Sequence, residues 1–401
     1  MSKSNETTPN VPTLRFPNFV GAWQKTSMEN VCSFSKGYGI SKDNLTLEGT
    51  PCILYGELYT TYKTAIAKKI KSKTNLNPKN LFHSKKNDVI IPCSSEIAEN
   101  IATSVCIPYD DVLLGGDLTV IRSNLDGAFL CNQLNSKRKY DIIRLVQGTT
   151  IAHLRAVELK KIDIVFPLIK EQRKISGFID LIDNRIAVQN KIIEDLKILK
   201  KELCNKVFNC SFCNSEIQIR EVANIYGGYA FSSKTYVERG HYKIITIGNV
   251  TGEHFVSGEY NTIDNLPRNL QKEQILDDGD ILISLTGNVG RISLVNGEKF
   301  LLNQRVAKLA IEDRSLKEYM YQYLSHSSFE KDMQNAGQGA AQKNIKNADI
   351  LSYRIHVPSK QESLDKIVTL FLTYDKKIEN ETKIFNFLLC QKSYLVNAMF
   401  I

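Results

Sequence analysis

The chain repeats itself, and this duplication constrains its fold more than any other feature of the sequence. A shift of roughly 190 residues aligns most of the chain with itself. VCSFSKGYGIS at 31–41 falls on VANIYGGYAFS at 222–232, and DVI at 88–90 falls on DIL at 280–282. A tandem duplication of this length predicts two similar units related by a pseudo-twofold internal repeat.

Each half has the same order of predicted elements. Short runs of β-branched and aromatic residues, separated by Gly, Asn and Asp, are typical of strands. They lie at 52–58, 88–91, 118–121, 244–247, 280–284 and 307–311. A short helical segment follows, at 126–147 and again at 316–335, and then a strand that ends in Pro, at 162–167 and 353–358. Each half therefore predicts a compact α+β domain.

After each of these Pro residues the spacing of apolar residues changes from two to about 3.5, which is the heptad pattern of paired helices. The first seam is Ile175, Ile179, Ile182, Ile186, Gln189, Ile193, Leu196, Lys200, Leu203 and Val207. The second is Ile367, Phe371, Tyr374, Ile378, Glu381, Phe385, Leu388, Lys392, Leu395 and Met399. Neither Gly nor Pro interrupts the runs after Gly177, so each predicts a helix of roughly 30 to 35 residues, about 50 Å long.

Polar residues interrupt both seams at the same places, Gln189 and Lys200 in the first and Glu381 and Lys392 in the second. An apolar seam of this length needs a partner, and the other seam is the nearest complementary surface. We expect an antiparallel coiled coil in which these four polar residues come together and fix the helix register. The alternative is that each helix packs only on its own domain.

The chain length and the net charge restrict the possible classes of function. The 401 residues, 42% of them hydrophobic, are enough for two independent cores. The formal net charge of +9 favours an anionic partner, and nucleic acid is the commonest one. No stretch approaches about 18 uninterrupted apolar residues, and the start MSKSNETTPNVPTL lacks the apolar core of a signal peptide. We therefore expect a cytoplasmic protein that makes no membrane contact.

Catalytic and metal-binding motifs are missing from the sequence. No phosphate-binding loop, zinc-protease helix or amino-methyltransferase motif occurs, and the six His are isolated from one another. Nine scattered cysteines indicate reduced thiols. The one C-x-x-C, at 210–213, has no second pair, so a flexible domain junction is favoured over a zinc site. We expect a non-catalytic chain that needs no cofactor and no metal.

Polar, Gly-rich loops at strand ends are the places where a rigid scaffold carries binding residues. In the first half these are the loop 36–42 and the segment 59–86, which is rich in Lys and contains no Asp or Glu. This favours DNA contact over a merely solvated surface, with Lys on phosphates and the interleaved Tyr and Thr supplying specificity. The candidates are Lys36, Tyr38, Lys42, Tyr59, Thr61, Tyr62, Lys63, Lys68, Lys69, Lys85 and Lys86.

In the second half the loop 227–234 corresponds to 36–42, and two further polar turns lie at 284–291 and 303–305. Because Arg, Gln and Asn pair bidentately with guanine and adenine edges, we predict that Arg291, Asn303, Gln304 and Arg305 read bases. The alternative, turns that only hold a hairpin, suits the glycines. Further candidates are Tyr229, Ser232, Ser233, Lys234, Thr286, Asn288, Gln342 and Lys343, of which the last two either cap a helix or contact the DNA backbone.

The ordered motifs resemble those of a known family. They are LRFP at 14–17, Trp23, YGELYTTY at 55–62, G-x-x-G-R at 287–291, LLNQRV at 301–306, the Gln-Gly loops at 147–150 and 338–341, and Glu171-Gln172. In this order, and duplicated, they resemble the specificity subunit of type I restriction-modification enzymes over nearly the whole chain.

The resemblance implies two target recognition domains, each reading one half of a split double-stranded DNA site, held apart by the two paired helices. It also implies that the helices dock two methyltransferase (M) subunits and that restriction (R) subunits join through the complex. We expect a disordered N-terminus at 1–13, target recognition domains at 14–167 and 210–358, and spacer helices at 168–209 and 359–401.

Other functions stay open. The specificity subunit of a methylating type II system shares the plan, a freestanding DNA-binding regulator needs no methyltransferase, and a metal-dependent nuclease needs convergent acids that the sequence does not indicate. Apolar residues on the outer faces of the helices favour partner docking. The predicted ones are Phe178, Ile192, Leu199, Ile384 and Phe387.

Overall fold

A computed structural model describes residues 10–148, 151–208, 215–325, 327–337 and 343–401. The chain forms two compact units, and both of them contain parts of the two long helices. The first unit combines Met1–Lys191 with Thr382–Ile401, and the second is Ile192–Glu381. Within the described ranges, no helix has an apolar stretch long enough to cross a membrane.

The first unit contains a four-stranded antiparallel sheet and a five-stranded mixed sheet. The four-stranded sheet has the order β2 (Cys32–Lys36), β11 (Leu118–Ser123), β7 (Asp88–Pro92) and β9 (Val105–Ile107). The mixed sheet has the order β3 (Leu45–Thr46), β5 (Ser72–Thr74), β4 (Thr50–Ile53), β10 (Leu113–Leu114) and β6 (Phe82–His83). In the mixed sheet β10 pairs in parallel with β4.

Helices and two small strand pairs complete this unit. The strand pairs are β1 (Gln24–Ser27) with β13 (Asp163–Phe166), and β8 (Ser94–Ser95) with β12 (Ala152–His153). The helices are α1 (Glu57–Thr60), α2 (Ala98–Ile101), α3 (Gly127–Leu134), α4 (Lys139–Leu145) and α5 (Ala156–Leu159). The main apolar core collects side chains from α3, β11, the long helices and Trp23.

The second unit repeats this plan. Its antiparallel sheet has the order β15 (Asn224–Gly227), β22 (Val306–Ala310), β19 (Ile281–Ser284) and β20 (Ile292–Leu294). Its mixed sheet has the order β17 (Asn261–Ile263), β16 (Tyr242–Ile245), β21 (Phe300–Leu302) and β18 (Ile275–Leu276), and β21 pairs in parallel with β16. The strand β14 (Ser215–Gln218) pairs with β23 (Arg354–Val357), and the helices are α7 (Arg314–Leu324), α8 (Ser327–Ala336) and α9 (Asn347–Leu351).

Equivalent aspartates show how closely the two frames match. Asp88 and Asp280 are both buried, and each accepts a hydrogen bond from the backbone N–H three residues before it, at 2.8 Å. Each also pairs with a cation from the neighbouring antiparallel strand, Arg122 at 2.6 Å and Lys308 at 2.6 Å. The sequence repeat is therefore a repeat of structure, down to its buried charges.

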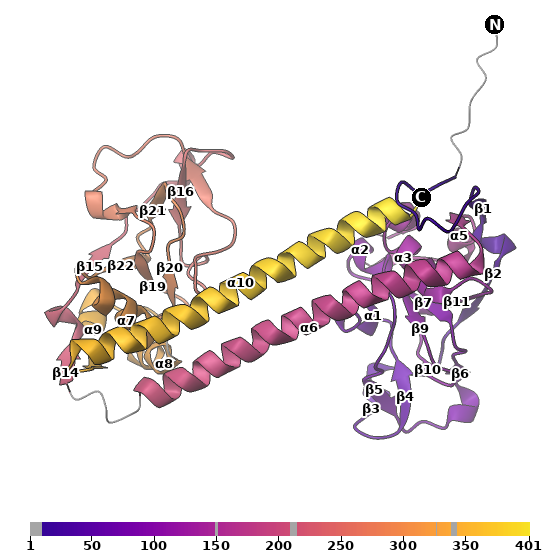
Figure 1. Cartoon of the computed structure of the whole chain (residues 1–401), viewed down its shortest axis with the longest axis horizontal. Coiled ribbons are helices and arrows are strands. Elements are labelled where there is room, and N and C mark those ends of the chain that lie inside the picture. The colour runs from indigo at the N-terminus through magenta and orange to yellow at the C-terminus, as the bar shows by residue number, and fades with distance from the viewer. Residues whose placement is uncertain (1–9, 149–150, 209–214, 326, 338–342) are drawn as a thin grey trace, which may run out of the picture. The chain divides into compact units, whose positions relative to one another are not determined.

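The predicted long helices are confirmed as α6 (Ile169–Phe208) and α10 (Gln361–Met399), which lie side by side (Figure 1). In the first unit, Ile175 of α6 shares a core with Met399, and Asp183 pairs with Lys392. In the second unit, Lys200 of α6 pairs with Asp375, and Phe208 stacks on Phe371, with ring centroids 5.5 Å apart. In both units residue numbers rise along one helix as they fall along the other, so the pairing is antiparallel, as predicted.

Three local expectations need correction. The strand expected at 52–58 ends at Ile53, because the chain turns into α1, where the carboxylate of Glu57 caps the N–H of Leu54 at 2.8 Å. The two expected helical segments are each divided, into α3 and α4 and into α7 and α8. Residues 10–13, expected to be disordered, are held in place: the backbone N–H of Trp23 donates to the carbonyl of Asn10 at 2.7 Å, and the hydroxyl of Thr13 donates to the carbonyl of Ala398 at 3.0 Å.

Candidate nucleic-acid interface

In both units a glycine lets the loop after the first sheet strand lie against the end of the parallel strand pair. A Cβ on Gly37 would lie 2.3 Å from the carbonyl oxygen of Gly115, and one on Gly228 would lie 2.0 Å from that of Asn303. Only glycine fits so close to another backbone segment. The loops predicted to bind DNA are therefore packed on the turns that follow β10 and β21.

The backbone of the turn 303–305 is held from two sides. Gln304 donates its N–H to the carbonyl of Tyr229 at 3.0 Å, and the carbonyl of Arg305 accepts from the N–H of Leu285 at 3.0 Å. Asn303 donates to the carbonyl of Ile245 at 3.2 Å. The side chains of Gln304 and Arg305 are exposed, so a rigid turn presents them to solvent.

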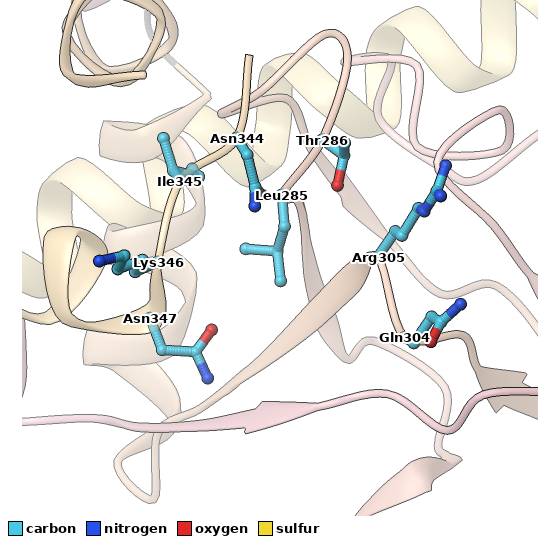
Figure 2. Close-up of a pocket in the computed structure, with 8 residues that line it drawn as sticks. All are labelled: Leu285, Thr286, Gln304, Arg305, Asn344, Ile345, Lys346 and Asn347. Carbon is cyan, nitrogen blue, oxygen red and sulfur yellow. The ribbon is translucent and has the colours of Figure 1, made fainter. Parts of the chain in front are cut away.

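Two further segments join this turn and enclose an open pocket of about 580 Å³ (Figure 2). Gly287 donates its N–H to the carbonyl of Lys343 at 3.1 Å, and Ile345 donates to that of Leu285 at 3.0 Å. The pocket is lined by Leu285, Thr286, Gln304, Arg305, Asn344, Ile345, Lys346 and Asn347. The structure thus brings together residues that were predicted to contact DNA and that lie in segments far apart in the sequence.

The two arginines predicted to read bases differ in their surroundings. Within the described part of the chain, the exposed guanidinium of Arg305 has no hydrogen-bond or ion-pair partner. The Nε of Arg291 lies 3.3 Å from Oε1 of Glu330 on α8, so this side chain is held by its own unit. Arg305 is therefore the arginine available to a ligand.

The glycines beside Arg291 serve the turn itself. Gly287 and Gly290 have φ angles of +75° and +79°, which favour glycine. Thr286 is half-buried at the pocket wall, whereas Asn288 is exposed and its carbonyl accepts the hydroxyl of Ser284 at 2.5 Å.

The remaining candidates of the second unit lie on the loop after β15 and beside the pocket. Tyr229 donates its hydroxyl to Oδ1 of Asn269 at 2.8 Å, and its ring packs edge-on against Phe231. The other members, Ser232, Ser233, Lys234 and Lys343, are exposed. Gln342 lies outside the described residues.

In the first unit the loop after β2 is also exposed. Tyr38 is 53% exposed and packs edge-on against Phe82, with ring centroids 6.3 Å apart. The exposed Nζ of Lys36 lies 3.8 Å from a carboxylate oxygen of Asp117, and Lys42 is exposed at the start of a 3-10 turn. These three side chains are accessible to a ligand.

The Lys-rich segment divides into accessible and structural residues. Lys63, Lys69, Lys85 and Lys86 are exposed, whereas Tyr59 and Thr61 are half-buried. Most of the predicted lysines are thus free to approach a phosphate backbone.

One prediction in this segment is corrected, and a second residue has a partner within its own unit. Tyr62 is 8% exposed and belongs to the core between the two sheets of the first unit, where burial raises the pKa of its phenol. Lys68 is directed to α6, where its Nζ pairs with Asp180 at 2.5 Å and donates to Asn184 at 2.6 Å. Tyr62 is therefore a core residue, and Lys68 joins the segment between α1 and β5 to the long helix.

Sequence reasoning missed Lys346 and Asn347, which line the pocket beside Asn344. It also missed that Asp117 of the first unit is the equivalent of Arg305 in the second. Leu113–Leu114 of β10 corresponds to the last two residues of β21, so the three residues after each strand are equivalent. The sequence repeat contained this signal, but the low similarity of the middle segments hid it.

Two ion pairs join the long helices through acids that the sequence analysis did not name. Lys200 pairs with Asp375 and Lys392 pairs with Asp183, each at 2.5 Å. Lys200 and Lys392 occupy equivalent positions of the repeat, and so do the two acids that they pair with. Both Gln189 and Glu381 are buried, and Oε1 of Glu381 lies 2.5 Å from Nζ of Lys377, one helical turn away.

Asp375 belongs to a buried polar cluster in the second unit. It also accepts from the amide of Gln322 on α7 at 2.6 Å, and it lies 4.0 Å from the imidazole of His254, which contacts the hydroxyl of Tyr321 at 2.8 Å. Burial lowers the pKa of His254. No group of three His, Cys, Asp or Glu in the described ranges is arranged to hold a metal ion.

The comparisons with known proteins agree on one family. The profile of the type I restriction modification DNA specificity domain matches this chain twice, over residues 21–197 and 214–388. The type I restriction enzyme MjaVIII specificity subunit of Methanocaldococcus jannaschii is 26% identical over 69% of this chain and 72% of its own. The putative MjaX specificity subunit of the same organism is 24% identical over 70% and 72%.

Solved structures share the fold. The S subunit of a type I restriction-modification system from M. genitalium is 19% identical and matches with a TM-score of 0.62 over 98% of this chain and 99% of its own. A chain from a structure of type I R-M complex assembly is 16% identical, with a TM-score of 0.56 over 94% and 96%. Because the family profile covers most of both repeats, this chain belongs to the specificity subunits of type I restriction-modification systems.

Proposed function

We propose that this chain is the non-catalytic DNA-recognition subunit of a type I restriction-modification complex and that it acts on DNA in the cytoplasm. Each repeat contributes one target recognition domain, 14–167 or 210–358, and one spacer helix, 168–209 or 359–401. Each domain reads one half of a bipartite site. The observation that carries the proposal is the duplicated frame, whose buried elements match while its exposed loops differ.

Affinity for DNA in the first domain comes from its exposed lysines. Lys36, Lys42, Lys69 and Lys85 are all exposed, and each phosphate contact releases counterions whatever the base sequence. In the second domain the exposed Lys234 and Lys343 take this role. Base contacts then supply the discrimination.

The long helices also serve as docking surfaces for two methyltransferase subunits, through which restriction subunits join. Apolar side chains remain exposed on both helices, such as Leu199 at 54% and Phe387 at 67%. Ile192 and Ile384, at equivalent positions of the repeat, are 39% and 43% exposed, which suits two identical partners. Phe178, expected in this set, instead packs edge-on against Phe16 in the first unit.

Methylation mapping tests the proposal. The chain is produced together with a cognate methyltransferase subunit, and the DNA of the producing cells is sequenced by a method that detects methylated bases. We expect one bipartite motif, with two specific parts separated by a gap of fixed length and unread sequence. A freestanding regulator would bind DNA without the methyltransferase and leave it unmethylated, which would refute the proposal.

A further inference from the structure

One exposed position changes its chemistry between the two repeats. After β10 the first domain has Gly115, Gly116 and Asp117, and at the equivalent place after β21 the second has Asn303-Gln304-Arg305. The last residue of each turn is thus an acceptor in one domain and a donor in the other. Asp117 lies 3.8 Å from Lys36 and accepts from the hydroxyl of Ser94 at 3.2 Å, whereas Arg305 has no partner in the described ranges.

This difference separates two kinds of DNA contact. The phosphate backbone is the same in every duplex, so a position that contacts phosphate in both domains would stay cationic. A position that reads a base edge is free to change with the base that its domain recognises. The exchange of carboxylate for guanidinium therefore excludes a phosphate contact shared by both domains at this place, and it leaves the turn free to differ with the base that each domain reads.

The geometry at Arg305 suits this role. The turn is fixed by hydrogen bonds to the loops on either side, so little backbone freedom is lost when a ligand binds. Arg305 lines the open pocket together with Thr286, and its guanidinium points away from the amides of Gln304 and Asn344 (Figure 2). None of the described residues that line the pocket is acidic, in contrast to the surroundings of Arg291, which faces Glu330.

We infer that Arg305 recognises a guanine in the half-site of the second domain, donating two guanidinium N–H groups to O6 and N7 in the major groove. The equivalent turn of the first domain makes no such contact. This inference rests on the proposed function, since it assigns one base of the proposed bipartite site.

The test uses the complex of this chain with its methyltransferase subunit and the motif found by methylation mapping. Duplexes carry each base pair of the second half-site changed in turn, or each guanine replaced by 7-deazaguanine, which lacks the N7 acceptor. We expect one guanine at which either change weakens binding about 10- to 100-fold for the natural chain. Arg305→Ala and Arg305→Lys should both abolish that preference, since lysine keeps the charge but not the planar fork.

Arg314→Ala is the matched control. Arg314 is also exposed, but it lies beyond the opposite end of β22 from Arg305. It should leave discrimination at every position unchanged.

Several results would overturn the inference while leaving the proposed function intact. One is a bipartite motif whose second half contains no G·C pair. Another is an Arg305→Ala chain that binds all sequences equally more weakly, which would make this residue a phosphate contact. A third is relaxed specificity in the half-site that belongs to the first domain. Absence of any bipartite motif would instead refute the proposed function itself.

Discussion

Replacing Gly228 by alanine should separate the loop after β15 from the turn that carries Arg305. The new Cβ would lie 2.0 Å from the carbonyl oxygen and 2.2 Å from the carbonyl carbon of Asn303, whereas real contacts essentially never fall below 3.0 Å. Because both atoms belong to the backbone, the turn has to move by about 1 Å. Overpacking of this kind costs about 1–3 kcal/mol, and it also strains the hydrogen bond from Tyr229 to Leu302, now 2.8 Å.

Gly227→Ala is the matched control, since a Cβ at Gly227 would meet nothing within 4 Å. Hydrogen exchange of peptides that cover β21 and β22 measures the local free energy of opening in each variant. Binding to duplexes altered in either half-site measures recognition. We expect faster exchange and weaker discrimination at the second half-site for Gly228→Ala alone. If the two variants agree within about 0.5 kcal/mol and discriminate equally, the close packing does not position the turn.

Three further outcomes follow from named contacts. Asp375→Ala leaves the Lys200 ammonium, which is 17% exposed, without its acceptor, so denaturant unfolding should show a loss of about 3–5 kcal/mol in the stability of the second unit. Replacing both residues by leucine should cost less stability, and the reverse order would refute the ion-pair argument. Because burial lowers the pKa of His254, the folded second unit resists protonation of this side chain. The stability of the unit should therefore be full above about pH 6.5 and fall below it, and a His254→Gln chain with the same pH dependence would contradict this. Lys69→Ala should weaken binding to all duplexes and lower the salt dependence of binding by about one in slope, and an unchanged slope would exclude a phosphate contact. Lys68→Ala should instead speed hydrogen exchange in α6, because Lys68 pairs with Asp180.

The sequence predicted the frame because its signals are periodic. Apolar spacing from Ile175 and Ile367 located both long helices, and the shifted match of Gly37 with Gly228 located the equivalent loops. These patterns report which residues share a face of a helix and where the chain turns, and both depend on the spacing of residues close together in the sequence. Helix ends and strand order followed less well, because tertiary contacts such as the cap from Glu57 decide them.

Individual side-chain partners were beyond the same reasoning. Spacing places Lys200 on the inner face of its helix, but a long flexible side chain reaches along the partner helix and finds Asp375. Tyr62 and Lys68 lie in one polar segment, yet one ring is buried and the other side chain turns to α6. These outcomes depend on contacts between segments far apart in the chain, which one sequence does not specify.

The two ion pairs between the long helices bear on how such a chain arose. Each joins a residue of the first repeat to one of the second, and by the repeat Asp375 is the counterpart of Asp183, and Lys392 that of Lys200. A half-length ancestor that ended after α6 would therefore have carried one acid and one base of this kind. Two copies of that ancestor, related by a twofold axis with their helices antiparallel, would have formed both ion pairs. Gene fusion would then have joined an existing symmetric homodimer and freed its two recognition surfaces to diverge.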